Sequence, residues 1–235
     1  MWIFPVLAAV VSAAFAVLLV RQLAQRRRPY QAVWALALVM FAVASAIVAV
    51  GVAGGWTVAE FKAYWLLGAV LTVPYLAQGE IYLLVRNARV ANLLMFVLFF
   101  GTAFALSRVR SSHVLATALA EDLPSGHDAF SGDAFALTLA RLYSYPAFAV
   151  LVLGTLWSAW RMRGSSELRD RFLGTLAIAL GATVVAAGSA FAAAGNATGF
   201  SLTLTAGIAA MFWGFLRASR PTQRLTPSSA DPASS

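Results

Sequence analysis

The chain has no cysteine and few acidic residues: its 235 residues include nine aspartates and glutamates against seventeen lysines and arginines. The absence of cysteine excludes disulfides, thiolate metal sites and cysteine nucleophiles. Charged residues make up only 11% of the chain, whereas a water-soluble domain carries about 25%. Hydrophobic residues make up 61%. This composition excludes an ordinary soluble domain and favours a membrane protein.

Long apolar runs account for most of this hydrophobicity. A helix of about 20 apolar residues crosses the hydrocarbon core of a bilayer. The predicted membrane helices cover residues 2–20, 33–53, 61–85, 90–106, 135–160, 172–194 and 200–216. The sequence therefore predicts an all-α, polytopic membrane protein whose seven transmembrane helices form one domain over residues 1–217.

Two polar stretches lie outside these helices. Residues 107–133 connect the fourth and fifth helices and contain both histidines of the chain, His113 and His127. We expect this stretch to be a solvated outer loop. Residues 218–235 are rich in proline, serine and alanine, and we expect them to form a disordered cytoplasmic tail.

The basic residues are distributed unevenly between the two ends of the predicted helices. Thirteen of the seventeen follow the first, third, fifth and seventh helices, and four lie at the opposite ends. Lysine and arginine collect on the cytoplasmic side of membrane proteins, so this bias predicts an outside N-terminus and a cytoplasmic C-terminus. Arginine greatly outnumbers lysine and alanine is abundant, which favours a bacterium with GC-rich genes. We therefore expect a multi-pass protein of the inner membrane, in contact with the lipid bilayer.

Several functions are disfavoured by what the predicted membrane helices lack. They contain no histidine, no GxSxG motif and no second carboxylate beside Glu80, so catalysis is disfavoured. The seventh helix has no lysine for a retinal Schiff base, and we expect no cofactor. The outer-loop histidines lack metal-ligand spacing, so no metal site is predicted. No basic stripe with interleaved aromatics is present, so we expect no nucleic-acid partner.

The third predicted helix, residues 61–85, holds the strongest candidate site. It contains Pro74, Gln78 and Glu80, and Glu80 is the only acidic residue in any predicted membrane helix. An ionisable side chain at this depth is costly to insert, so by default it is a functional hypothesis. Pro74 removes a backbone donor near mid-span and can kink the helix.

A rotation of about 100° per residue divides this helix into two surfaces. One surface is a seam of small, aromatic and hydroxyl-bearing side chains, which suits helix packing or a cavity wall. It comprises Tyr64, Gly68, Thr72, Tyr75, Gly79, Tyr82 and Arg86, with Gln78 at its edge. Glu80 lies off this seam, about 9 Å from the midplane towards the cytoplasm.

These surfaces support two interpretations of the third helix. In the first, Tyr75, Gln78, Glu80 and Tyr82 form a site for a ligand or a proton. In the second, Glu80 is a structural carboxylate that pairs with an arginine near the cytoplasmic face. The candidate arginines are Arg86, Arg161 and Arg163.

The sixth predicted helix carries glycines at a strict spacing of seven residues. They are Gly174, Gly181, Gly188 and Gly195. This spacing places them along one side of a helix, where the missing side chains let a neighbouring backbone approach closely. The pattern predicts a helix-packing seam and an interior position for this helix in the bundle.

Two stretches, RRRPYQAVWALALVMFAVASA and YWLLGAVLTVPYLAQGEIYLLVRNARVAN, resemble a set of uncharacterised seven-helix membrane proteins of GC-rich bacteria. The layout is similar, more distantly, to the seven-helix sensor regions that precede some histidine kinases. The resemblance covers about the first 110 residues. It implies no known activity in the first case, and in the second a sensory role that would need a separate effector partner.

Two functional classes follow. The first is a protein that binds or transports a small apolar or amphiphilic molecule, which predicts an internal cavity with Glu80 pointing into it. The second is a sensory, scaffolding or partner-stabilising membrane subunit, which predicts a solid bundle in which Glu80 is paired with an arginine.

Overall fold

The computed structural model describes residues 2–130, 133–164 and 168–219, and over these ranges it contains helices and no strands. Its elements are α1 (Ile3–Arg26), α2 (Pro29–Gly54), α3 (Val58–Tyr64), the π-helical turn η1 (Trp65–Leu71), α4 (Thr72–Leu84), α5 (Ala88–Ser111), the 3-10 turn η2 (Ala116–Ala120), α6 (Gly126–Ala129), α7 (Ala134–Met162), α8 (Arg169–Ala193) and α9 (Ala197–Ala218). From residue 220 onwards, the tail predicted over residues 218–235 lies outside the described residues.

Within these described ranges, seven helical runs are long and apolar enough to cross a membrane, which confirms the predicted all-α architecture. The elements α3, η1 and α4 join into one run, Val58–Leu84. Several helices extend beyond the predicted ends, and α1 continues to Arg26 rather than ending at residue 20. Polar residues at a helix end keep the backbone hydrogen bonds of the helix while their head groups reach water.

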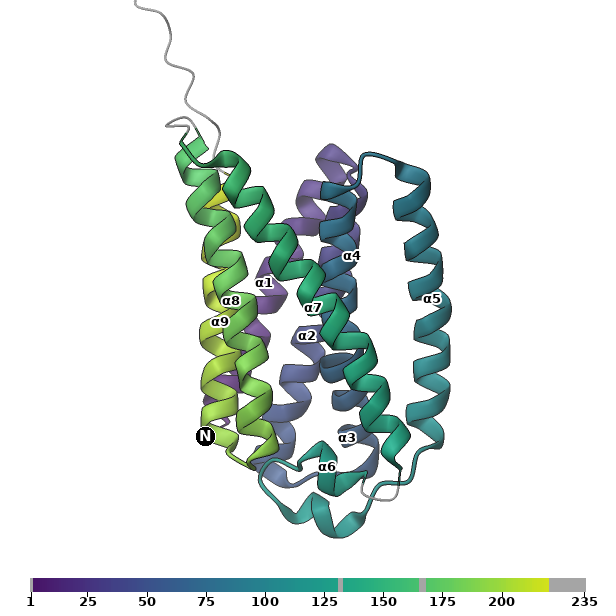
Figure 1. Cartoon of the computed structure of the whole chain (residues 1–235). Helices are drawn as coiled ribbons and strands as arrows, with labels where there is room; N and C mark the ends of the chain where they lie inside the picture. Colours follow the sequence, from purple (N-terminus) through teal and green to yellow (C-terminus); the bar gives the residue numbers. More distant parts are fainter. Residues whose placement is uncertain (1, 131–132, 165–167, 220–235) are drawn as a thin grey trace, which may run out of the picture.

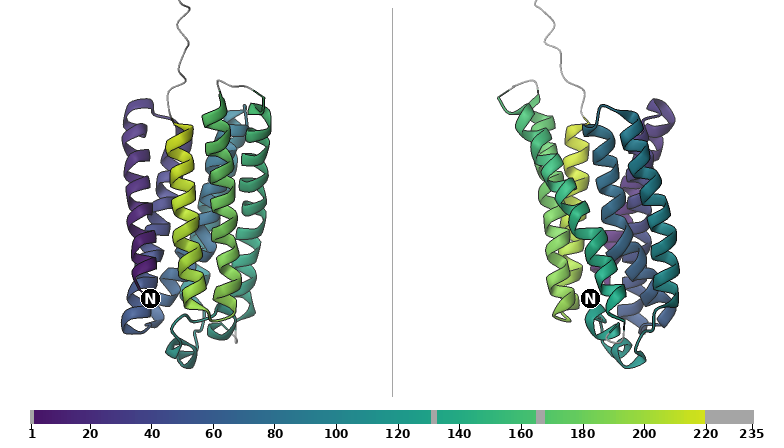
Figure 2. Two further views of the ribbon diagram at one scale, coloured as in Figure 1. Left: turned by 90° about the vertical axis from the view of Figure 1, so that its left-hand side faces the viewer. Right: turned by 45° about the vertical axis from the view of Figure 1, so that its right-hand side comes forward.

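Six of the described spans form a closed ring. Each contacts the next in the order α1, α2, α4, α7, α8 and α9, and α9 contacts α1 again. Figure 1 shows α8 and α9 side by side, with α7 crossing obliquely between this pair and α4. The left view of Figure 2 shows α1, α9, α8 and α7 as consecutive members of the ring. α5 lies outside the ring, against α4, η1 and α7.

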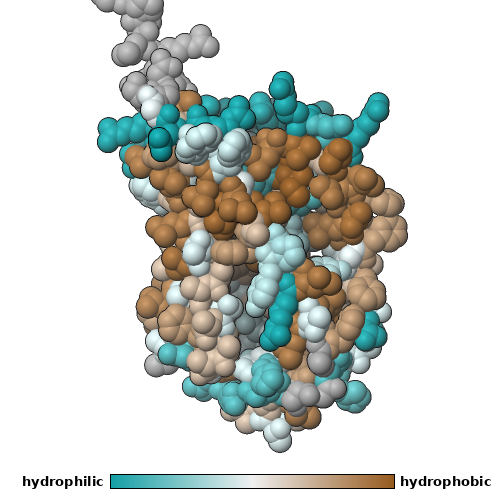
Figure 3. Space-filling model, in the orientation of Figure 1, coloured by the Kyte–Doolittle hydropathy of each residue, from teal (hydrophilic) through white to brown (hydrophobic). Residues whose placement is uncertain are grey.

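The bundle has two distinct ends. The N-terminus and the α5–α7 connection lie at one end, called the loop end below (Figure 1). The α1–α2, α4–α5 and α7–α8 connections lie at the other, called the arginine end. Figure 3 shows a hydrophilic rim at the arginine end above a hydrophobic band. The described arginines at or near this end are Arg21, Arg26, Arg27, Arg28, Arg86, Arg89, Arg161, Arg163, Arg169, Arg171 and Arg217.

The prediction that the sixth membrane helix occupies the interior is wrong. This helix, α8, is a member of the ring between α7 and α9, and Leu180 on its outer side is 63% exposed. The helices with the largest buried share are α2 and the α3–α4 run. A glycine seam demands one close neighbour but leaves the other sides of the helix free to face lipid.

Three of the four seam glycines meet α9. A Cβ added to Gly181 would lie 2.5 Å from the carbonyl oxygen of Gly207, and one added to Gly188 would lie 2.6 Å from the hydroxyl of Thr203. A Cβ on Gly174 would overlap the Gly214 carbonyl. The fourth, Gly195, has no neighbour within 4 Å and follows the end of α8 with a φ of 67°. Gly195 therefore serves the turn rather than the packing contact.

The outer loop predicted over residues 107–133 is neither as long nor as solvated as expected. α5 continues to Ser111, and the following residues fold back over the loop end (Figure 1). Leu123 and Phe130 are fully buried there, and the Trp56 indole donates a hydrogen bond of 3.0 Å to the Asp122 carbonyl. This segment forms an ordered cap because apolar side chains between its polar residues reach the aromatic cluster beneath it.

Candidate functional site

The run from α3 to α4 is irregular at mid-span. Pro74 has no backbone N–H to donate, and the preceding turn, η1, is π-helical rather than α-helical. Both the backbone N–H and the hydroxyl of Thr72 donate to the Leu67 carbonyl, the hydroxyl at 2.7 Å. π-helical turns inside membrane and soluble helices occur often at functional sites.

A neighbouring helix supports this irregular turn. The hydroxyl of Ser144 on α7 donates to the carbonyl of Ala69, at 2.5 Å. A π-turn changes the phase of every residue that follows it, so one 100° wheel cannot describe the whole span. Gly68, inside this turn, lies against Ala44 of α2 and against Tyr64 one turn earlier, and Tyr64 packs on Phe200 of α9.

Three of the four predicted site residues bind α5. The Tyr75 hydroxyl lies 3.0 Å from the Thr102 hydroxyl, and the Gln78 side-chain amide donates to the Ala91 carbonyl at 2.8 Å. The Tyr82 hydroxyl donates to the Asn92 side chain at 2.9 Å. Positions 75, 78 and 82 lie along one side of α4, so these bonds join the outlying helix α5 to the ring.

Glu80 lies apart from these three residues. It is 2% exposed and packs against Gly154 of α7. A Cβ added to Gly154 would lie 2.8 Å from Glu80 Cγ and 3.3 Å from its Oε1. The structure therefore divides the predicted four-residue site into an α5-binding stripe and a separate carboxylate at the α4–α7 contact.

The predicted pairing of Glu80 with an arginine does not form. Arg86, Arg161 and Arg163 are exposed, and the one ion pair within residues 2–130, 133–164 and 168–219 joins Arg217 to Asp170 at 3.0 Å. Among these described residues, no hydrogen bond or ion pair involves the Glu80 side chain. Arginines at the end of a span reach the water layer more readily than a carboxylate one turn deeper.

The α2 helix contributes two residues that sequence reasoning missed. The Trp34 indole donates to the Leu76 carbonyl at 2.9 Å and occupies the space beside Gly79. One turn earlier, Gln31 is 1% exposed; its amide nitrogen donates to Gln22 at 3.2 Å and its Oε1 has no partner. Gln31 could have been noticed in the sequence, because it is a polar residue among the apolar positions of α2.

A groove lies on the outer surface of the ring, away from Glu80. It has a volume of about 480 Å³, lies between α7 and α8, and is lined almost wholly by apolar side chains. Its lining residues are Val152, Leu156, Leu176, Ala177, Ala179, Leu180 and Thr183. Glu80 does not line this groove, so the predicted link between the carboxylate and a cavity finds no support here.

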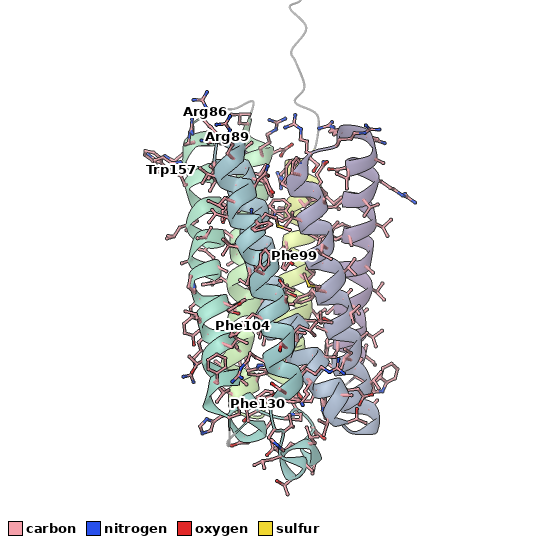
Figure 4. The ribbon with its side chains drawn as sticks, turned by 90° about the vertical axis from the view of Figure 1, so that its right-hand side faces the viewer. Arg86, Arg89, Phe99, Phe104, Phe130 and Trp157 are labelled. Atoms are coloured by element: carbon pink, nitrogen blue, oxygen red, sulfur yellow. The ribbon has the colours of Figure 1, made fainter. Side chains whose placement is uncertain are left out.

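The aromatic cap closes the ring at the loop end. Phe130 packs between Phe61 and Trp65, with ring centroids 5.5 and 5.3 Å apart. Figure 4 places Phe130 at the loop end, opposite Arg86 and Arg89 at the arginine end. The Nε1 of Trp65 is buried without a partner among the described residues. The interior is therefore covered at the loop end, and Glu80 lies towards the other end.

Two unpartnered polar groups, one on α2 and one on α4, are the groups with which the bundle could bind a ligand or a proton. Gln31 Oε1 and the Glu80 carboxylate are hydrogen-bond acceptors, and a buried carboxylate without a partner is stabilised by a proton or by a cationic group. In the part of the chain that the structure describes, no three His, Cys, Asp or Glu side chains lie close enough together to hold a metal ion.

No family model, curated protein or solved structure matches the chain.

Proposed function

We propose that this protein binds or transports a small amphiphilic molecule, and that Glu80 receives its cationic or hydrogen-bond-donating head, or a proton. The observation that carries the proposal is the burial of Glu80, at 2% exposure, without a donor among the described residues. An uncompensated carboxylate at this depth lowers stability. Such a group is therefore a candidate for ligand or proton handling.

The surroundings of Glu80 support an amphiphilic ligand rather than a fully polar one. Leu84 lies with Glu80 against Gly154, and the buried apolar residues Ala77 and Leu151 lie three residues before Glu80 and Gly154, respectively. One acidic group beside apolar side chains suits a molecule with one polar head and an apolar body. Access would require α7 to move away from α4 at Gly154, because Glu80 does not line the groove between α7 and α8.

The orientation of the bundle in the membrane is part of the same proposal. The arginines at one end of the bundle favour a cytoplasmic arginine end, an outside N-terminus and an inner-membrane location in a bacterium. On this orientation Glu80 lies one helical turn, about 6 Å, from the cytoplasmic end of α4. The site would then exchange its ligand or proton with the cytoplasmic side.

A binding assay on purified protein tests the role of Glu80. Tetraphenylphosphonium, a lipophilic cation, serves as the probe in isothermal titration calorimetry, and its release from proteoliposomes measures transport. We expect Glu80→Gln to weaken binding by about tenfold or more. Glu121→Gln makes the same chemical change at an exposed loop position and serves as the control. Unchanged binding and flux in Glu80→Gln would remove Glu80 from the mechanism.

The alternative function is a sensory, scaffolding or partner-stabilising subunit, which the outer face of α5 favours. This helix is peripheral, and its large exposed apolar side chains include Phe96, Phe99, Phe100 and Phe104. Figure 4 shows Phe99 and Phe104 along this helix. The resemblance to sensor regions of histidine kinases belongs to this alternative. It predicts that Phe99→Ala abolishes copurification of a membrane partner, while Glu80→Gln has no effect on it.

A further inference from the structure

We propose that the groove between α7 and α8 binds an anionic phospholipid, with an acyl chain in the groove and the phosphate head group on the arginines above it. This site is separate from Glu80 and independent of the function proposed for that residue.

The groove has the chemistry of an acyl-chain site. Its lining is apolar apart from Thr183, whose hydroxyl donates to the Ala179 carbonyl at 2.9 Å and is thereby satisfied within α8. Leu156 and Leu180 line it and are also exposed on the outer surface of the bundle. The groove is therefore open to the side that faces lipid.

The sides of α7 and α8 that line the groove carry arginines at the arginine end of the bundle. On α7, Trp160 lies one turn beyond Leu156, and Arg163, the residue directly after the helix, lies seven residues beyond Leu156. On α8, Arg169 lies seven residues before Leu176. Seven residues are two helical turns, or about 10 Å, which returns to nearly the same side of each helix. Arg163 and Arg169 thus lie above the two walls of the groove, at the depth of a head group.

The local charge is complementary to a phosphate. Residues 161–171 contain four arginines, Arg161, Arg163, Arg169 and Arg171, against two acidic residues. One of these acids, Asp170, accepts a hydrogen bond of 3.0 Å from Arg217, so its charge is already compensated. Each arginine near a membrane surface adds to the attraction for anionic lipid.

Tryptophan marks the boundary between the groove and the arginines. The rings of Trp157 and Trp160 lie 5.2 Å apart and are both exposed. Figure 4 shows Trp157 projecting outward just below the arginine end. Indole rings prefer the interface between acyl chains and head groups. The apolar groove is therefore followed by the tryptophan pair and then by the arginines. This order matches the acyl chain, the interfacial region and the phosphate head group of a phospholipid.

Native mass spectrometry of the full chain tests this site. The protein is released from nanodiscs containing equal amounts of phosphatidylglycerol and phosphatidylcholine, and the bound lipids are counted. We expect the wild type to retain phosphatidylglycerol preferentially, and Arg163→Gln/Arg169→Gln to lower this preference by about tenfold. Arg86→Gln/Arg89→Gln removes the same charge from the α4–α5 connection and the first turn of α5, and we expect it to retain the preference.

A second variant separates the groove from the charge. Leu180→Trp fills the groove at an exposed position and leaves all arginines in place. We expect it to lose retained phosphatidylglycerol although its net charge is unchanged. Equal retention of the two lipids by the wild type, equal loss in the two arginine double variants, or full retention by Leu180→Trp would each overturn the proposal. Displacement of the lipid by inorganic phosphate alone would also contradict it, because the chain and the head group are proposed to bind together.

Discussion

The Glu80 side chain occupies the space that a side chain on Gly154 would fill. A Cβ at position 154 would lie 2.8 Å from Glu80 Cγ and 2.7 Å from Leu84 Cδ1. Glycine at this position of α7 is therefore a condition for burying the carboxylate between α4 and α7. The polar group and the small residue belong to different spans and form one structural unit.

Gly154→Val should destabilise the bundle by about 1–3 kcal/mol, because the added side chain overpacks the contact with Glu80. Thermal unfolding in detergent, followed by circular dichroism, measures the change. In the double variant Gly154→Val/Glu80→Ala, part of the loss should be recovered. Gly54→Val is the control, since a Cβ there has no neighbour within 4 Å. Equal destabilisation by the two valines would show that the effect is not specific to this contact.

Glu80→Gln should have the opposite effect on stability. Glutamine has nearly the same shape but removes a buried charge that has no partner among the described residues, so we expect a gain of about 1–2 kcal/mol. The same unfolding experiment measures it, with Glu121→Gln as the exposed control. A gain in stability together with a loss of binding is the pattern of a functional group. A marked loss of stability would mean that the carboxylate has a structural partner.

Gln78→Met should loosen α5 without unfolding the ring. The substitution keeps the side-chain volume but removes the 2.8 Å hydrogen bond to the Ala91 carbonyl. We expect a cost of about 0.6–1.7 kcal/mol, the range for hydrogen bonds between membrane helices. Hydrogen exchange should increase in α5 and stay unchanged in α8. Tyr145→Phe, which removes an exposed hydroxyl from α7, should change neither.

Gly181→Val should separate α8 from α9. Its Cβ would lie 2.5 Å from the Gly207 carbonyl oxygen and 2.8 Å from the Met211 backbone nitrogen, and neither backbone atom can move independently of its helix. We expect destabilisation of about 3 kcal/mol. Ala187→Val adds volume to an exposed position of the same helix and should be nearly neutral. If both variants unfold at the same temperature, the glycine contact is unimportant for stability.

Trp56→Phe should open the cap at the loop end. Phenylalanine keeps the aromatic contacts with Phe61 and Tyr64 but cannot donate to the Asp122 carbonyl. We expect faster proteolysis between His113 and Asp128, because cleavage follows local opening. Trp2→Phe alters an exposed indole at the same end and should leave the cleavage rate unchanged.

The sequence was sufficient for the seven spans because apolar length is a local property of the chain. The sequence could not predict the position of α8 in the bundle. A glycine seam indicates that one neighbouring helix packs closely, but it does not indicate whether the other sides of α8 face protein or lipid. The buried cap was missed because Leu123 and Phe130 are separated by polar residues, and their burial depends on an aromatic cluster formed by residues 56–65.

The candidate site was partly accessible from the sequence. Periodicity separated Glu80 from Tyr75 and Tyr82, and the structure gives these residues different neighbours. The identity of the neighbours could not be derived, because Gly154 and Ala91 approach α4 from other helices. The π-turn was also inaccessible: Pro74 indicates a missing donor, but the hydroxyl of Ser144 that bonds the turn comes from α7.

The closed ring has a consequence for biogenesis. α1 contacts α9, where Phe15 lies 4.8 Å from Phe215 and the Thr205 hydroxyl donates to the Phe4 carbonyl at 2.7 Å. During synthesis α1 enters the membrane before α9 exists, so one of its faces must remain against lipid or the insertion machinery until α9 arrives. Ring closure therefore follows translation of residue 218 and cannot proceed pairwise along the chain. A ribosome stalled before α9 would hold an open arc of helices.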